Sequence, residues 1–122
     1  MMEVYRNFKF DAAHLLPNLP PDHKCSRLHG HTFEVCITVE GAVGEETGWV
    51  MDYAAIKTSF QPVLDQLDHA YLNDIPGLEN PTSENIARWI WTCLKASIPD
   101  LSIIEVRETQ FSGCRYRGEE EK

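Results

Sequence analysis

One stretch decides both the fold and the chemistry expected of this chain: residues 25–40, which read CSRLHGHTFEVCITVE. From residue 32 onward apolar and polar side chains alternate as in a β-strand, where residues i and i+2 share a face. His29 and His31 therefore project together, and Gly30 leaves space between them. Two neutral imidazoles joined by a third make an open zinc site, with one position left for water or substrate. Cys25 lies close by and is a candidate acid or base rather than a fourth ligand.

His14 is the candidate for the third ligand. A strand is expected over residues 4–14, because alternate positions there are mostly apolar, namely Val4, Phe8, Phe10 and Ala12. His14 ends this strand on the apolar face, and the strand can pair with a second one expected over residues 28–40. Two adjacent imidazoles repel when protonated and leave unsatisfied nitrogens when buried neutral, and a shared metal removes both problems. His23 lies instead in a polar, Pro-rich loop, where an ordinary polar histidine is the better interpretation.

Two helices are expected in the second half of the chain. The first follows Asp52, a candidate N-cap, and carries apolar residues at helical spacing to Leu67, with Pro62 kinking or splitting it. The second begins at Thr82 or Ser83 and ends near residue 99, with an apolar face formed by Ile86, Ile90, Cys93 and Leu94. A last strand is expected over residues 102–111, with one face formed by Ile104, Val106 and Glu108. This order predicts an α+β fold, an antiparallel sheet with helices on one face.

Composition narrows the range of functions. The chain has 122 residues, 43% of them hydrophobic, which is enough for one domain over residues 1–122. Its formal net charge of −8 and lack of a basic block argue against nucleic-acid binding. The N-terminus does not resemble a signal peptide, and no apolar run is long enough to span a membrane. Four widely spaced cysteines without a CxxC pair are typical of reduced thiols, so we expect a cytoplasmic protein.

The remaining candidates are weaker when judged from the residues alone. Cys25 lies between Lys24 and Arg27, and positive neighbours favour the thiolate form of a cysteine. Asp68 and His69 are adjacent in sequence, which does not by itself make them point at one another. Glu108 is interpreted as a solvated strand residue, and the other three cysteines, Cys36, Cys93 and Cys114, as structural.

Several motifs together resemble the 6-pyruvoyl-tetrahydropterin synthase / 6-carboxy-tetrahydropterin synthase family over nearly the whole chain. They are FDAAH at 10–14, Cys-x3-His-Gly-His at 25–31, GWVMDY at 48–53, LDHAYLN at 67–73, NPTSEN at 80–85 and VRET at 106–109. The spacing between the thiol and the histidines is the most specific of these and resembles the bacterial queuosine-pathway branch. The pyruvoyl-forming enzymes typically place more residues there. A further branch replaces the cysteine with glutamate, and Cys25 argues against it.

The resemblance implies a tunnelling fold, with a four-stranded antiparallel sheet and two helices in each subunit. Trimers close their sheets into a barrel, two trimers usually stack into a homo-hexamer, and the sites lie between subunits. The implied zinc ligands are His14, His29 and His31. The implied catalytic residues are Cys25 as general base, Asp68 with His69 in proton transfer, and Glu108, which also anchors the pterin ring. Thr82 and Ser83 match positions that line the pterin pocket. Charge alone points to four cations for a triphosphate: Lys24, Arg27, Arg115 and Arg117.

The implied reaction is the zinc-dependent conversion of 7,8-dihydroneopterin triphosphate to 6-carboxy-5,6,7,8-tetrahydropterin, acetaldehyde and triphosphate, catalysed by a carbon–carbon lyase. Three rival functions stay open: the pyruvoyl-forming reaction, a non-catalytic zinc- or pterin-binding subunit, and a zinc hydrolase. The combination of Cys25, Asp68 and His69 favours an enzyme over a binding subunit. A hydrolase is disfavoured because neither an HExxH motif nor a clear glutamate base near the metal is evident.

Overall fold

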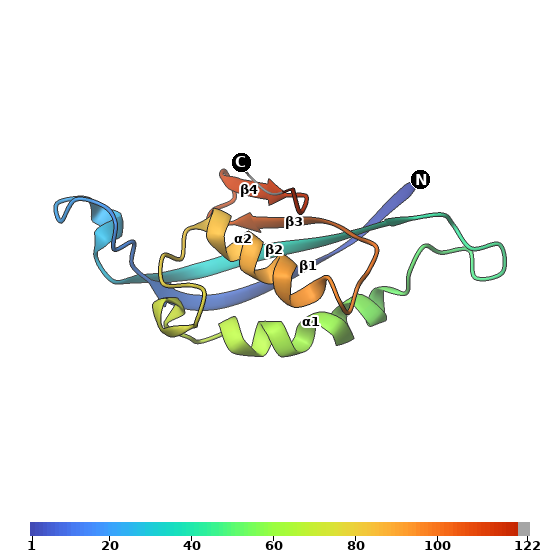
Figure 1. Ribbon diagram of the computed structural model, residues 1–122, viewed down its shortest axis with the longest axis horizontal. Coiled ribbons are helices and arrows are strands. Elements are labelled where there is room, and N and C mark those ends of the chain that lie inside the picture. The colour runs from blue at the N-terminus through green and yellow to red at the C-terminus, as the bar shows by residue number, and fades with distance from the viewer. Residues whose placement is uncertain (120–122) are drawn as a thin grey trace.

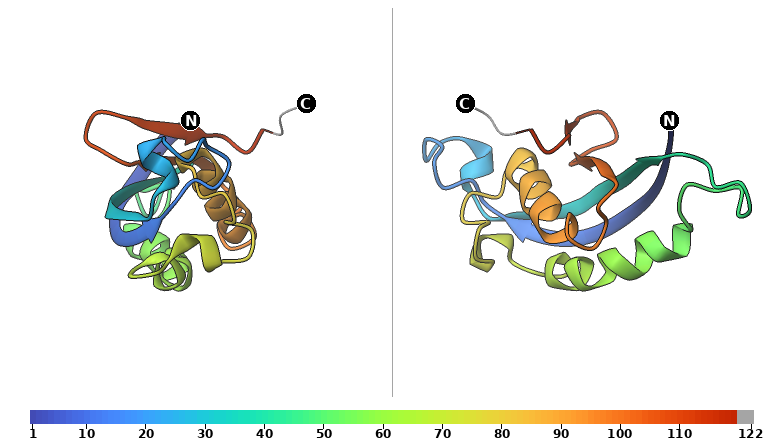
Figure 2. Two further views of the ribbon diagram at one scale, coloured as in Figure 1. Left: turned by 90° about the vertical axis from the view of Figure 1, so that its left-hand side faces the viewer. Right: turned by 45° about the vertical axis from the view of Figure 1, so that its right-hand side comes forward.

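A four-stranded antiparallel sheet forms the centre of the protein. The computed structural model describes residues 1–119. The strands follow the order β1-β2-β3-β4, with β1 at Met2–His14, β2 at His29–Gly41, β3 at Leu101–Arg107 and β4 at Gly113–Tyr116. Helices α1 (Tyr53–Leu67) and α2 (Ser83–Leu94) come between β2 and β3 in the chain and lie on one face of the sheet (Figure 1 and Figure 2). The predicted α+β architecture is confirmed.

The long hairpin of β1 and β2 carries the core and ends at the candidate metal ligands. The two strands pair along their whole length, from Met2 opposite Gly41 to His14 opposite His29. Alternation places one row of side chains beneath the helices, and that row is buried: Phe10, Ala12, Phe33, Val35 and Ile37. His14, His29 and His31 continue the same row at the end of the hairpin where β1 stops and β2 begins, so the site adjoins the core directly.

Helix α1 is continuous through its proline. Asp52 is the N-cap, because its Oδ1 accepts a hydrogen bond from the backbone N–H of Ala54 at 2.9 Å. The buried face consists of Ile56, Phe60, Val63 and Leu67. Pro62 lies inside the helix but on its exposed side. The carbonyl that loses a hydrogen bond to this proline belongs to the exposed Thr58 and can face water, so the helix is not split.

Helix α2 begins as expected but ends earlier. Thr82 is its N-cap and accepts a hydrogen bond from the N–H of Asn85 at 3.1 Å. The helix stops at Leu94 instead of continuing to residue 99. Cys93 is exposed, so its predicted place on the buried face is wrong. The buried stripe includes Ala87, which shifts its centre around the helix and leaves Cys93 at the margin.

The last predicted strand is shorter than expected, because the chain turns back after Arg107. Residues 108–112 form the turn into β4, so Glu108 is not a strand residue and does not continue the buried row of Ile104 and Val106. Gly113 follows the turn, and a Cβ atom there would lie 2.6 Å from the carbonyl oxygen of Val106. Only glycine allows β4 to approach β3 this closely.

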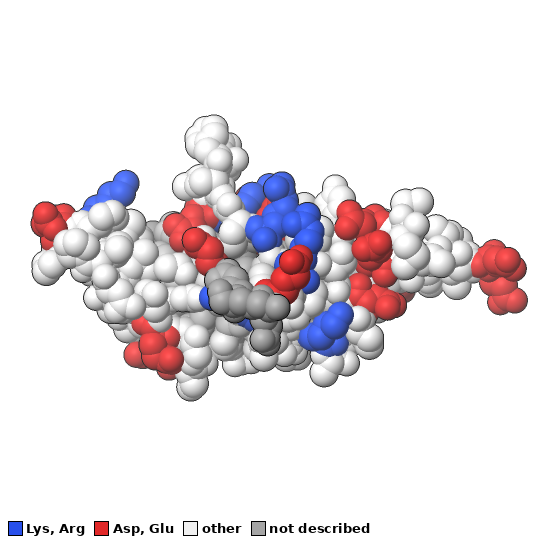
Figure 3. All heavy atoms as spheres, turned by 45° about the horizontal axis from the view of Figure 1, so that its top comes forward, with Lys and Arg blue, Asp and Glu red and all other residues white. Residues whose placement is uncertain are grey.

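The surface is charged unevenly. In Figure 3 the largest group of Lys and Arg side chains lies near the middle of the face shown, with acidic side chains on either side. On β3 and β4 the Nε of Arg115 lies 2.6 Å from Glu105 Oε1, and an oxygen of Glu34 on β2 accepts from Arg107 at 2.7 Å. Within residues 1–119, no helix has the length and apolar character needed to cross a bilayer.

Candidate metal centre and active site

Strand register brings the three histidines together. His14 lies directly opposite His29, and His31 lies opposite Ala12, two positions further along β2. Their ring nitrogens can be chosen so that all three lie within 4.8 Å of one another. Phe33 forms the floor of the cluster, with its ring centroid 4.1 Å from that of His31 and 5.2 Å from that of His14.

Backbone carbonyls orient each imidazole. The Nδ1 of His14 lies 2.9 Å from the carbonyl oxygen of Pro81, and that of His29 lies 2.7 Å from the carbonyl oxygen of Arg27. His31 Nδ1 has a longer contact of 3.3 Å with the carbonyl of Thr32. A ring that donates from Nδ1 keeps the lone pair on Nε2, which is the usual outer-shell arrangement of metal-binding histidines.

The spacing of the Nε2 atoms fits zinc. The Nε2 atoms of His14 and His31 lie 3.3 Å apart. Two nitrogens about 2.0–2.1 Å from one tetrahedral zinc lie roughly 3.3–3.4 Å apart. The donor set of three imidazoles, with space on one side, matches an open zinc site with three protein ligands. The residues present therefore fit the metal that the sequence predicts.

Burial keeps His14 in the form that binds metal. Its side chain is 1% exposed. Burial lowers the pKa of His14 below its usual value, and the neighbouring His29 and His31 lower it further, against the opposing effects of the Pro81 carbonyl and Glu108. The imidazole is therefore held neutral, which is the state that a metal ligand requires.

A hollow of about 450 Å³ opens beside the histidines and contains the candidate thiol and carboxylate. It is lined by Lys24, Cys25, His29, Gly30, His31, Glu108 and Thr109. Cys25 is delivered by a short 3₁₀ helix, η1 (Lys24–Ser26), and its N–H donates to His23 Nδ1 at 3.1 Å. His23 therefore caps the turn that places the thiol, a role that its polar loop setting alone did not indicate.

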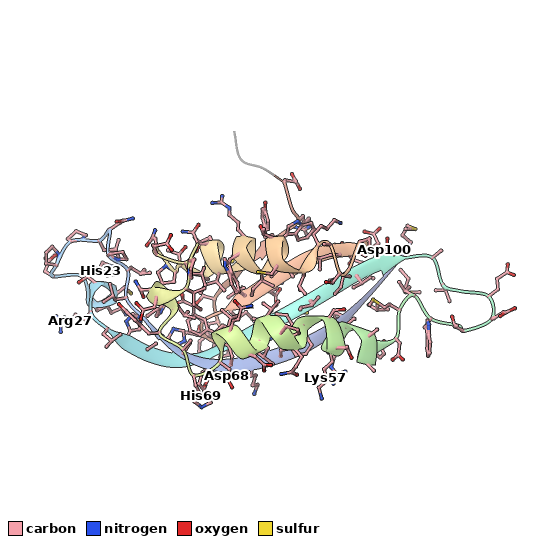
Figure 4. All side chains as sticks on the ribbon, turned by 60° about the horizontal axis from the view of Figure 1, so that its bottom comes forward. His23, Arg27, Lys57, Asp68, His69 and Asp100 are labelled. Carbon is pink, nitrogen blue, oxygen red and sulfur yellow. The ribbon has the colours of Figure 1, made fainter. Side chains whose placement is uncertain are left out.

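Asp68 and His69 do point at one another. The Nδ1 of His69 lies 3.0 Å from Asp68 Oδ2. His69 has a φ of 59°, the left-handed region that a non-glycine residue rarely adopts. Figure 4 shows the pair side by side just beyond the C-terminal end of α1. His69 lines a hollow of about 430 Å³ that meets the Cys25 hollow only at Gly30 and His31. Within one chain the Cys25 thiol and His69 thus face different hollows.

Thr82 and Ser83 lie next to Glu108. All three line a hollow of about 370 Å³ at the start of α2, and Cys114 from β4 lines it as well. Burial raises the pKa of the Cys114 thiol, partly offset by a hydrogen bond with Ser83. The sequence indicates only a structural role for Cys114, because it is the β3–β4 turn that brings this residue to the hollow.

The four predicted cations are dispersed. Lys24 lines the Cys25 hollow, whereas Arg115 and Arg117 line a separate hollow of about 680 Å³ along β3 and β4. The side chain of Arg27 is exposed and points outward from the loop between β1 and β2 (Figure 4). Its carbonyl, by contrast, holds His29 in place. Lys24 is therefore the best placed of the four to meet a substrate beside the histidines.

The three convergent imidazoles at the end of the β1–β2 hairpin, with a thiol and a carboxylate beside them, fit the site that the sequence motifs predict for a pterin synthase. The sequence profile described as 6-pyruvoyl tetrahydropterin synthase matches residues 3–119, and the chain belongs to that family. The resemblance seen in the motifs is thereby confirmed, as is the prediction that the chain is an enzyme, a pterin-processing lyase.

Individual relatives agree with this placement. The chain is 46% identical to 6-carboxy-5,6,7,8-tetrahydropterin synthase of Synechocystis sp., over 95% of this chain and 93% of that protein. It is 40% identical to dihydroneopterin monophosphate aldolase of Pyrococcus furiosus, over 79% and 76% of the two chains. Among solved structures, 6-pyruvoyl tetrahydropterin synthase of Caenorhabditis elegans superposes with a TM-score of 0.89 at 28% identity, covering 97% of this chain and 96% of the other. These neighbours confirm the predicted fold.

Proposed function

We propose that this chain is a zinc-dependent 6-carboxy-5,6,7,8-tetrahydropterin synthase. It converts 7,8-dihydroneopterin triphosphate and water to 6-carboxy-5,6,7,8-tetrahydropterin, acetaldehyde and triphosphate, a step towards queuosine. The observation that carries this proposal is the hollow in which Cys25 and Glu108 flank the histidine cluster. It is supported by the identity to the Synechocystis enzyme over almost the whole chain.

The three histidines would hold the zinc through Nε2, and the bound ion would supply Lewis acidity towards the side-chain hydroxyls of the substrate. The carboxylate of Glu108 accepts hydrogen bonds from the ring N–H and amino groups of the pterin and fixes its orientation. Thr82 and Ser83 line the adjoining wall of the pterin pocket. These contacts place the substrate side chain over the histidines and its reacting C–H bonds beside the Cys25 sulfur.

Proton transfer needs an acceptor and a donor. Cys25, as thiolate, removes a carbon-bound proton from the substrate side chain. His69 returns a proton, and Asp68 holds its ring through the 3.0 Å contact at Nδ1. The charge of Lys24, which lines the same hollow as Cys25, compensates the negative charge of the phosphate groups.

The proposed active unit is an assembly of copies, a homo-hexamer built from two trimers. The different hollows that Cys25 and His69 face within one chain support this, since a site shared between copies can bring the thiol of one to the Asp68–His69 pair of the next. We also propose that the enzyme is cytoplasmic, in keeping with its free cysteines.

Product analysis tests the reaction. The zinc-loaded protein is incubated with 7,8-dihydroneopterin triphosphate, and the products are identified by mass spectrometry together with an assay for acetaldehyde. Formation of 6-carboxy-5,6,7,8-tetrahydropterin with equimolar acetaldehyde supports the proposal. A 6-pyruvoyl product without acetaldehyde would establish the pyruvoyl-forming reaction instead.

The same product assay distinguishes an aldolase and a non-catalytic subunit from the proposed synthase. Because the chain is similar to the Pyrococcus aldolase, dihydroneopterin monophosphate must be tested as an alternative substrate in a separate incubation. A strong preference for it, with cleavage of the side chain but no change in ring oxidation, would contradict the proposed function. Tight binding of a pterin with no turnover of either substrate would identify a non-catalytic subunit.

A further inference from the structure

We propose that Asp11 is a positioning residue, which fixes the Asp68–His69 pair to the strand that carries the metal ligands. The inference rests on the proposed function and extends it to a residue outside the predicted site. Asp11 lies on β1, is exposed, and pairs with Thr32 of β2. Its backbone contacts the Asp68–His69 pair, and its side chain contacts Thr32 on the strand that carries His29 and His31. The proposed reaction depends on the relative position of these two groups.

The backbone of Asp11 grips both members of the pair. Its N–H donates to Asp68 Oδ1 at 3.0 Å, and its carbonyl oxygen accepts from the N–H of His69 at 2.6 Å. One further bond, from the N–H of Ala13 to the carbonyl of Ala70 at 3.0 Å, continues the attachment along the edge of β1. Asp68 is therefore held by one oxygen to β1 and by the other to the ring of His69.

The side chain of Asp11 connects this attachment to β2. Its Oδ1 accepts a short hydrogen bond from the hydroxyl of Thr32, the residue directly opposite. Thr32 follows His31, and its carbonyl contacts the Nδ1 of that ring. A continuous path of contacts thus runs from the proposed metal ligand through Thr32 and Asp11 to Asp68 and His69.

The left-handed backbone of His69 is unfavourable by itself and needs contacts that stabilise it. A residue in the left-handed region with a side chain costs about 1 kcal/mol or more, and such conformations persist where their surroundings fix them. The bond from His69 N–H to Asp11 supplies one such constraint. Loosening β1 at Asp11 should let the backbone relax and turn the imidazole away from Asp68.

Six variants of the full-length, zinc-loaded protein separate positioning from general stability. Asp11→Ala and Thr32→Val each remove the cross-strand bond, whereas Asp11→Asn and Thr32→Ser each keep an acceptor or a donor. Lys9→Ala is the matched control, because Lys9 forms an exposed cross-strand pair with Glu34 on the same two strands without contacting Asp68 or His69. The double variant Asp11→Ala/Thr32→Val closes a mutant cycle.

Two measurements read out the position of His69. The first is the tautomer of its ring from ¹⁵N NMR at about pH 9, where imidazoles are neutral; the wild type should carry the hydrogen on Nδ1, bonded to Asp68. The second is steady-state kinetics, in which small misplacement of a reacting group costs up to about 100-fold in rate. We expect Asp11→Ala and Thr32→Val to lose Nδ1 protonation at His69 and at least about tenfold in kcat. KM and zinc content should stay unchanged.

The conservative variants and Lys9→Ala should behave as wild type, and the double variant should be no worse than the more impaired single variant. An unchanged His69 tautomer in both Asp11→Ala and Thr32→Val would overturn the inference, as would an equal loss of kcat in Lys9→Ala. The NMR result does not depend on turnover. A chain that shows the tautomer change but converts neither pterin substrate would contradict the proposed function and leave the positioning role intact.

Discussion

The role of each imidazole in this protein depends on the hydrogen-bond partner of its Nδ1 atom. The Nδ1 atoms of His14 and His29 face carbonyl oxygens, so their Nε2 atoms are directed at a common point. His69 uses Nδ1 for Asp68 instead and is not part of the group of three histidines that could hold a metal. The same side chain therefore serves as a proposed ligand in one place and a proposed proton donor in another.

Removal of one ligand should separate these roles. His29→Ala leaves two imidazoles, and zinc affinity should fall by more than the roughly 10- to 100-fold caused by losing an outer-shell partner. Activity should disappear with the metal. His69→Ala is the matched control, since it should lose turnover but keep zinc. Metal content after dialysis against a chelator measures the difference, and equal zinc retention in both variants would exclude His29 as a ligand.

The thiol is expected to matter for chemistry and not for the metal. Cys25→Ala should retain zinc but lower kcat by about 10²- to 10⁴-fold, the usual contribution of a general base. Cys93→Ala serves as the control, because Cys93 is exposed on α2 and does not line the hollows that contain Cys25, His69 and Glu108. Steady-state kinetics of the two variants, with zinc measured in each, decides the matter. Full activity of Cys25→Ala would remove the thiol from the mechanism.

The carboxylate of Asp68 should stay ionised in acid. The N–H of Asp11 and the ring of His69 hold the pKa of Asp68 below its usual value of 3.8. A carboxyl group with a lowered pKa stabilises the fold above its unfolded pKa and loses that contribution as the pH falls through its folded pKa. A ¹³C NMR titration should give a midpoint below 3.8, and below that of the same carboxyl in the urea-unfolded chain. A midpoint at or above the unfolded value would contradict these contacts.

These residues differ in how far the sequence could foretell them. The strand pattern around Gly30 was sufficient to place His29 and His31 on one face, because alternation is a local property. The pairing of Asp68 with His69 could not be predicted from adjacency, since it occurs with a left-handed backbone at His69 whose N–H is bonded to the edge of β1, a contact distant in sequence. The position of Glu108 next to the histidines likewise depends on a turn that follows β3 and was supplied by the family resemblance alone.

The helices were easier to predict at their starts than at their ends. Asp52 and Thr82 both form the N-cap bonds that their side chains predict. The end of α2 could not be located, because Ile98 is buried four residues after Leu94, at helical spacing, although residues 95–97 form an exposed turn and do not continue the helix. Prolines indicated only some of the helix boundaries: Pro81 immediately precedes the N-cap of α2, whereas Pro62 lies within α1 without ending it.

Thr82 caps α2 and also lines the hollow proposed as part of the pterin pocket. Thr82→Ala removes the bond to Asn85 and should lower the free energy of unfolding by about 1 kcal/mol. Thr82→Ser keeps an acceptor and should be close to wild type in stability. Urea denaturation followed by circular dichroism compares the three proteins. A Thr82→Ala variant as stable as Thr82→Ser would show that the observed cap contributes nothing to the fold.

The molecule as a whole places Cys25 and His69 in two hollows that share Gly30 and His31 in their linings. A site assembled from two copies predicts that one chain supplies Cys25 and a neighbour supplies Asp68 and His69. The variants Cys25→Ala and His69→Ala should then each be inactive alone but active when mixed and allowed to exchange subunits. In a ring of copies with random pairing, about a quarter of the sites would combine an intact thiol with an intact histidine, which sets the activity expected of an equimolar mixture.

The control for this experiment is a mixture of His69→Ala with the double variant Cys25→Ala/His69→Ala. This mixture should recover no activity, because no chain in it carries an intact His69. Size-exclusion chromatography with light scattering confirms that the mixed species has the mass of the wild-type assembly. If the wild type is an active monomer, or if exchange gives full-size assemblies without activity, both groups must act within one chain. In either case the Cys25 sulfur and the His69 ring would have to come together by a movement within one chain, and no neighbouring copy would be needed to complete the site.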